Sequence, residues 1–113
     1  MIPVTEKLSI GEQMLEDAVA ILKALADPNR LRIFDLLMQG DLCNYELKEK
    51  LGLPPNLLSH HLRVLRQAGL VLTRRDVIDG RLIYYVVKKK VVASWRTWLN
   101  EFLDPARDHE RLV

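Results

Sequence analysis

The chain has 113 residues, of which 49% are hydrophobic and 28% charged, and its formal net charge is +2. This length suits one compact domain with a modest core and is too short for two such domains. No run of about 18 apolar residues occurs, and no basic region followed by an apolar stretch opens the chain, so we expect no membrane span, no secretory signal and a cytoplasmic location. The single cysteine cannot form an internal disulfide, which agrees with a reducing compartment.

Positive charge is concentrated in one part of the chain. Residues 60–90 hold eight arginines and lysines against two aspartates, a net charge of +6. Residues 1–27 have a net charge of −3, from two lysines against five carboxylates. Such a concentration favours binding to a phosphate backbone, with an affinity that falls steeply as salt rises.

The first third of the chain predicts an arm followed by two helices. Residues 1–10 have no sustained hydrophobic period, so we expect a flexible N-terminal arm, followed by one domain over residues 11–104. From Glu12 to about Ala26 an apolar stripe repeats at helical spacing and is wider than one small neighbour needs, which favours a second subunit against part of it. Asp27 and Pro28 then predict the cap and first turn of a core helix that Gly40 ends.

Residues 40–70 have the pattern of a helix-turn-helix. Leu47 and Leu51 lie at helical spacing, and Gly52 predicts a left-handed helix end. A second helix is expected from about Pro55 to Ala68. If its apolar face packs on the core, the opposite face points outward and is predicted to contact base edges in DNA. The residues on that face are Asn56, Leu57, Ser59, His60 and Arg63. The alternative interpretation is an ordinary solvated helix face.

A β-hairpin is predicted directly after this unit. Residues 70–75 and 81–87 are β-branched and aromatic runs, and the Asp79-Gly80 pair between them favours positive φ in a tight turn. A helix-turn-helix followed by such a hairpin is a winged helix. Arg74, Arg75 and Arg81 are then placed to reach phosphates or the minor groove, although edge-strand solubility is an alternative role for them.

The C-terminal part predicts one more amphipathic helix, from Val91 to about Leu103, and a short charged tail over residues 105–113. The helices proposed so far cannot cover the apolar faces of both the first and the last helix. We therefore expect these two helices to pair across a two-fold axis, through Leu15, Leu22, Trp95, Trp98, Leu99 and Phe102. The alternative is that the two tryptophans pack inside one monomer.

Four segments together resemble the ArsR/SmtB family of bacterial repressors: residues 24–33, 40–47, 58–65 and 80–85. The similarity extends over roughly residues 15–103. It implies a mainly α-helical fold with a small β-hairpin wing, assembled as a homodimer. It further implies that this winged helix-turn-helix binds a double-stranded DNA operator and is released by an effector, often a metal or metalloid ion.

The resemblance leaves the effector open. Metalloid-sensing relatives begin the third helix with Cys-x-Cys, and here Cys43 matches the first position while Tyr45 stands at the second. One thiolate supplies too few ligands for a soft ion unless other groups contribute. A zinc-type site of Asp, His, His and Glu on the last helix is not expected, because residues 91–103 contain no histidine. Cys43 is therefore a structural residue, a metal or metalloid ligand, or a redox-sensing thiol.

Neighbouring His60 and His61 point about 100° apart on a helix and are poorly placed to chelate one ion. We expect His60 to contact DNA and His61 to be partly buried. The sequence shows no Gly-rich phosphate loop and no nucleophile with a paired base, so an enzyme is not expected. The alternatives to a dimeric repressor are a winged-helix protein-interaction module and a thiol-based redox regulator.

Overall fold

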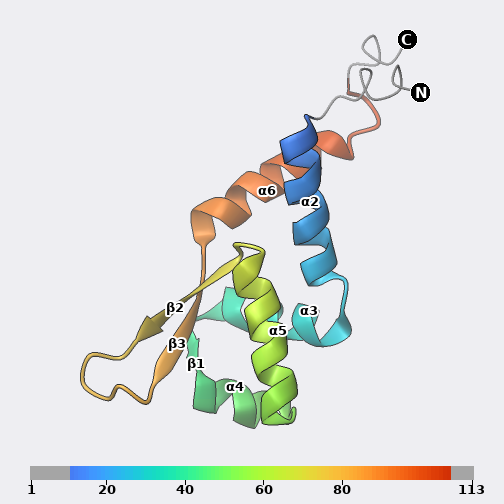
Figure 1. The fold of residues 1–113 in the computed structure, drawn as a ribbon. Coiled ribbons are helices and arrows are strands. Elements are labelled where there is room, and N and C mark those ends of the chain that lie inside the picture. The colour runs from blue at the N-terminus through green and yellow to red at the C-terminus, as the bar shows by residue number, and fades with distance from the viewer. Residues whose placement is uncertain (1–10, 108–113) are drawn as a thin grey trace.

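The computed structural model describes residues 11–107, so the arm predicted for residues 1–10 and most of the predicted tail lie outside the described residues. In chain order the elements are α2 (Glu12–Leu25), α3 (Pro28–Gln39), β1 (Leu42–Cys43), α4 (Asn44–Leu51), α5 (Pro55–Gln67), β2 (Val71–Arg75), β3 (Ile83–Val87) and α6 (Lys89–Phe102). The predicted fold class, mainly α-helical with a small β wing, is confirmed (Figure 1).

Short-range signals set the helix ends. The Asp27 carboxylate accepts hydrogen bonds from the backbone N–H groups of Asn29 (2.8 Å) and Arg30 (3.2 Å), which caps α3 as predicted. Gly52 ends α4 in the left-handed conformation, at φ 64°. Pro55 then opens α5 at a position where its missing N–H has no helical partner.

The sheet differs from the predicted hairpin in two ways. It has three antiparallel strands in the order β1-β3-β2, because Leu42 and Cys43 pair with Tyr85 and Tyr84. The prediction of positive φ at the Asp79-Gly80 turn is wrong, since within residues 11–107 only Gly52 and Gly69 adopt left-handed φ values. The Asp76 side chain organises the turn instead, by accepting the N–H groups of Ile78 and Asp79.

One core joins α3, α4, α5 and the sheet. Its most deeply buried large side chains are Ile33, Leu47, Leu65 and Leu70, and α2 adds Ile21 and Ala24. By contrast, α6 contains no buried residue, although Val92 and Trp95 pack against the core. The N-terminal half of α2 and the C-terminal half of α6 extend beyond the rest of the fold (Figure 1). In the part of the chain that the structure describes, no helix has the length and apolar character needed to cross a membrane.

Candidate nucleic-acid interface

Helix α5 separates its side chains into two faces. Leu58, His61, Leu62 and Leu65 are buried against the core. The five residues predicted to read DNA, Asn56, Leu57, Ser59, His60 and Arg63, are all exposed. Four of them, Asn56, Leu57, Ser59 and His60, lie in the N-terminal half of α5, which is where a recognition helix contacts base edges, and Arg63 follows one turn later. All five side chains are therefore accessible to a groove of DNA.

A basic groove continues from this face, and the sequence-based prediction did not include it. The groove has a volume of about 550 Å³ and lies between α5 and β2, lined by Arg63, Arg66, Gln67, Val71, Leu72 and Thr73. Arg63 and Arg66 stand one helical turn apart, so their i, i+3 spacing is the signal that places both on one side of α5. Two guanidinium groups beside a hydroxyl suit contact with a phosphate.

The buried His61 holds α5 against the start of α3. A guanidinium nitrogen of Arg30 lies 3.1 Å from His61 Nδ1, and Nε2 lies 3.9 Å from the Asp27 carboxylate. Burial lowers the pKa of His61, and the positive charge of Arg30 adds to this, whereas Asp27 opposes it. His61 is therefore more fully buried than predicted and serves to position the helix.

The wing arginines are exposed, but each also contacts a group within the wing. The Arg74 guanidinium lies 4.7 Å from the centre of the Tyr84 ring, and Arg75 donates a hydrogen bond to the Gly80 carbonyl. Arg81 forms an ion pair with Asp79 at 3.0 Å. Hydrogen bonds from Arg81 lower the pKa of Asp79, and the same pairing raises the pKa of Arg81. Because exposed pairs are weak, a phosphate can replace these partners.

Cys43 is buried at the start of α4 and belongs to β1. Its backbone N–H donates to the Glu46 carboxylate at 2.9 Å. This bond and the Cys43 thiol lower the pKa of Glu46 despite partial desolvation. Within residues 11–107, no three His, Cys, Asp or Glu side chains gather as a metal-binding group would require. The geometry gives Cys43 a packing role in the single chain, with the Glu46 carboxylate beside its thiol.

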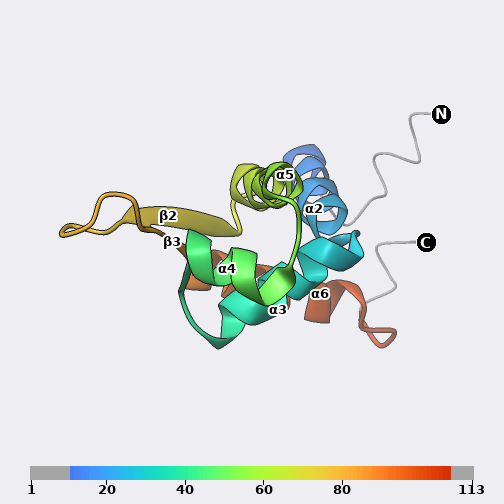
Figure 2. The ribbon, with the colours of Figure 1, turned by 90° about the horizontal axis from the view of Figure 1, so that it is seen from below.

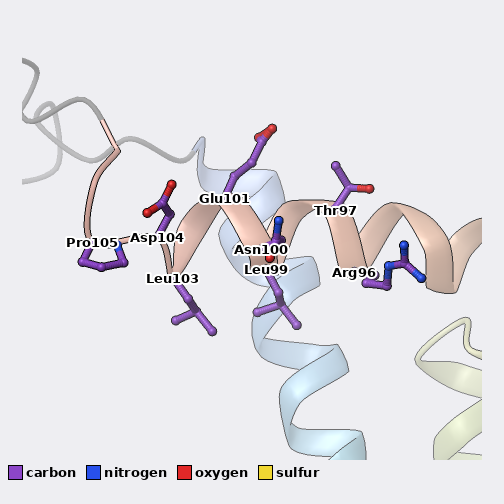
Figure 3. Close-up of a pocket in the computed structure, with 8 residues that line it drawn as sticks. All are labelled: Arg96, Thr97, Leu99, Asn100, Glu101, Leu103, Asp104 and Pro105. Carbon is purple, nitrogen blue, oxygen red and sulfur yellow. The ribbon is translucent and has the colours of Figure 1, made fainter.

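The residues predicted to form a dimer interface all have apolar surface that remains exposed to solvent in the single chain. Leu15 and Leu22 on α2 are exposed, as is Phe102 on α6, whereas Trp95, Trp98 and Leu99 are half-buried. Trp98 stacks on Phe102, with ring centres 4.8 Å apart, and meets Trp95 edge-on at 5.5 Å. Figure 3 shows Leu99 and Leu103 on the same side of α6, opposite Thr97 and Glu101. The apolar side of α6 is thus continuous.

Comparison with known proteins gives a consistent result. The family described as bacterial regulatory protein, arsR family, matches residues 27–73. The transcriptional repressor SdpR of Bacillus subtilis is 32% identical over 84 residues, which are 74% of this chain and 90% of SdpR. The regulator NmtR of Mycobacterium tuberculosis is 40% identical over 100 residues, 88% of this chain and 75% of NmtR.

Solved structures agree. HlyU from Vibrio cholerae superposes with a TM-score of 0.66 at 32% identity, covering 82% of this chain and 98% of HlyU. The match to the family, the similarity to SdpR over nearly its whole length and the shared winged-helix fold lead to one conclusion. The chain belongs to the ArsR/SmtB family of DNA-binding transcriptional regulators, a family of regulators and not of enzymes.

Proposed function

We propose that this protein is a homodimeric repressor that binds a pseudo-palindromic operator and is released from it by an effector. The observation that carries the proposal is the exposed face of α5, where Asn56, Ser59, His60 and Arg63 stand free beside a basic wing. Asn and Arg side chains can form paired hydrogen bonds with adenine and guanine, and exposed Leu57 suits a thymine methyl group. Arg74, Arg75 and Arg81 are assigned to phosphates or the minor groove.

The uncovered apolar sides of α2 and α6 support the homodimer. Leu22 is 48% exposed and Leu103 is 69% exposed, and both lie among other apolar residues that contribute little to the monomer core. Pairing these helices across a two-fold axis removes that surface from water. It also presents two copies of α5, which can enter successive major grooves about 34 Å apart.

The effector part of the proposal rests on family membership and on Cys43. A relative named arsenical resistance operon repressor, from Staphylococcus xylosus, is 46% identical over half of this chain. Cys43 is the only thiol that the sequence offers to a metalloid or an oxidant. For a metal or metalloid, further ligands must come from the partner chain or from residues outside 11–107, because in the described part Cys43 and the neighbouring Glu46 do not belong to any group of three possible ligands.

The test is fluorescence anisotropy with DNA from upstream of the protein's own gene and with scrambled DNA of equal length. We expect the protein to bind its operator at least about a thousandfold more tightly than scrambled DNA at physiological salt. Arg63→Ala should reduce this ratio, and Arg96→Ala, an exposed arginine on α6, is the matched control. Equal binding to both DNAs, followed by capture of a protein partner, would instead identify an interaction module.

The effector is tested on the same complex with arsenite, zinc and hydrogen peroxide added separately. Release by one of them that is lost in Cys43→Ser would identify both the effector and its ligand. Cys43→Ala is the companion variant, since it removes the thiol without leaving a hydroxyl in a buried position. Release that persists in both variants would assign sensing to other residues.

A further inference from the structure

The tip of the wing displays two apolar residues to solvent. Val77 is 98% exposed and Ile78 is 96% exposed, so neither contributes to the core. Both are β-branched and adjacent in the sequence, in the loop that joins β2 to β3. The hairpin formed by these strands extends away from the helices (Figures 1 and 2). Single exposed apolar residues are common on protein surfaces. Two adjacent ones in the same exposed loop instead indicate a surface that is buried against a partner.

The loop that carries this pair is held in shape by hydrogen bonds. The Asp76 carboxylate accepts from the N–H groups of Ile78 (3.1 Å) and Asp79 (2.8 Å). The Asp76 N–H donates to the Leu82 carbonyl at 2.8 Å, and the Leu82 N–H donates to the Asp79 carbonyl at 3.0 Å. The two side chains are therefore presented by a preformed turn. Their branching limits rotation about χ1, which reduces the entropy lost when they are buried against a partner.

The charges around the tip favour a polyanion as that partner. Arg74, Arg75 and Arg81 flank the loop. Both nearby carboxylates are already engaged, Asp76 with backbone N–H groups and Asp79 with Arg81. Arginines before and after an apolar loop fit the minor groove of DNA, where phosphates line both sides and apolar wedges partly unstack a base step. The family to which the chain belongs binds DNA, so DNA is the polyanion that we assign to the tip.

On this basis, and resting on the proposed DNA-binding function, we infer that Val77 and Ile78 enter the minor groove as an apolar wedge. The wing then selects DNA sequences by how easily their base steps can be unstacked. Pyrimidine–purine steps such as TA and CA/TG unstack easily, whereas A-tracts are stiff. The protein therefore prefers operators that place a flexible step under each wing, at base pairs that α5 does not contact, and it bends the DNA there.

The test uses operator variants that differ only at the step under the wing, which hydroxyl-radical footprinting locates. The parent protein is expected to bind the TA operator about tenfold more tightly than the AA operator. 2-Aminopurine placed at this step should brighten on binding, which reports unstacking. The Val77→Thr/Ile78→Thr variant keeps the branching of both side chains but makes them polar. This double variant should bind both operators with equal affinity, and the fluorescence of 2-aminopurine should not rise when it binds.

The control variant is Met38→Thr, a comparable change at an exposed apolar residue of α3 outside the wing and the basic groove, which should retain the TA preference. Equal affinity of the parent for both operators, with selectivity over scrambled DNA intact, would overturn the wedge and leave the proposed function standing. Loss of selectivity over scrambled DNA would overturn both. A change of mass of the double variant in sedimentation, without DNA, would assign the tip to contacts between copies of the chain.

Discussion

A guanidinium nitrogen of Arg30 lies 3.1 Å from His61 Nδ1, which joins the first turn of α3 to α5, the proposed recognition helix. Because Arg is always a donor, Nδ1 must accept, and the imidazole proton is then on Nε2. Arg30 also donates to the carbonyl groups of Ala24 (2.6 Å) and Lys23 (3.3 Å) at the end of α2. The Arg30 side chain therefore connects α3 with α2, which carries part of the proposed dimer contact, and with α5, which carries the proposed DNA contact.

Arg30→Ala is expected to lower the free energy of unfolding by about 1.5–3 kcal/mol, because it removes charge-assisted hydrogen bonds and leaves His61 Nδ1 buried without a donor. Urea unfolding at neutral pH measures the loss. Arg32→Ala is the control, since Arg32 is exposed and its hydrogen bond goes to the neighbouring Asn29 side chain. Similar losses in both variants would show that the contact with His61 adds little stability.

Stability should fall as the pH drops below the ordinary His61 pKa of 6.5. Burial holds the pKa of this imidazole lower in the folded chain, with Arg30 and His60 acting in the same direction and Asp27 against it. The unfolded chain therefore binds a proton that the folded chain does not, and the folded state loses stability until its own lower pKa is reached.

Urea unfolding between about pH 7.5 and about pH 5.5 tests this expectation. His61→Gln should flatten the dependence, whereas His60→Gln, which removes the adjacent exposed imidazole, should keep it. A parent protein of constant stability across this range would contradict the assignment. The Asp27 carboxylate titrates at a lower pH and does not contribute to this dependence. Despite partial desolvation, hydrogen bonds from the backbone N–H groups of Arg30 and Asn29 hold its pKa below the ordinary value of 3.8.

Asp79→Asn should strengthen binding to DNA of any sequence. The substitution removes the carboxylate that pairs with Arg81 at 3.0 Å, while its amide oxygen can still accept the Arg81 backbone N–H. Arg81 is then free to bind a phosphate, so the plot of log affinity against log salt should steepen by about one unit per bound wing. Arg81→Ala should make the slope shallower by a similar amount. Unchanged slopes in both variants would remove Arg81 from the DNA contact.

Leu22→Lys should convert the proposed dimer into a folded monomer. Leu22 is 48% exposed in the single chain, so the monomer tolerates a lysine there, whereas a dimer would have to bury its charge. Sedimentation gives the mass, and circular dichroism shows whether the helices persist. Gln13→Lys adds the same charge at an exposed α2 residue whose side chain bonds Asp17, and should leave the mass unchanged. A parent protein that sediments as a monomer would refute the interface.

The sequence was sufficient to predict the helices because their ends depend on local chemistry. Asp27, Gly52 and Pro55 each act within a few residues, and all three stand where they were expected. Strand β1 was not predicted, since two residues carry no period and their partners lie about 40 positions away. The wing turn was misjudged because the Asp76 side chain, and not Gly80, sets its shape.

The candidate site was predictable to a similar extent. The 3.6-residue period was enough to identify the exposed face of α5, including Arg63. It did not reveal that Arg30, from another helix, would meet His61, because this contact depends on tertiary packing. The pairing of Arg81 with Asp79 was also missed. A β-hairpin pattern fixes which residues face outward, but not how charged side chains in the turn partner one another.

Strand β1 links the base of the wing to the helix-turn-helix. β1 pairs with β3 immediately before α4 begins, and the Asn44 amide oxygen at the start of α4 accepts the Ile83 N–H at 3.1 Å. The base of the wing and the first helix of the helix-turn-helix are thereby one hydrogen-bonded unit. The conformational entropy of fixing the wing relative to this helix is lost when the chain folds, so less remains to be lost when DNA binds.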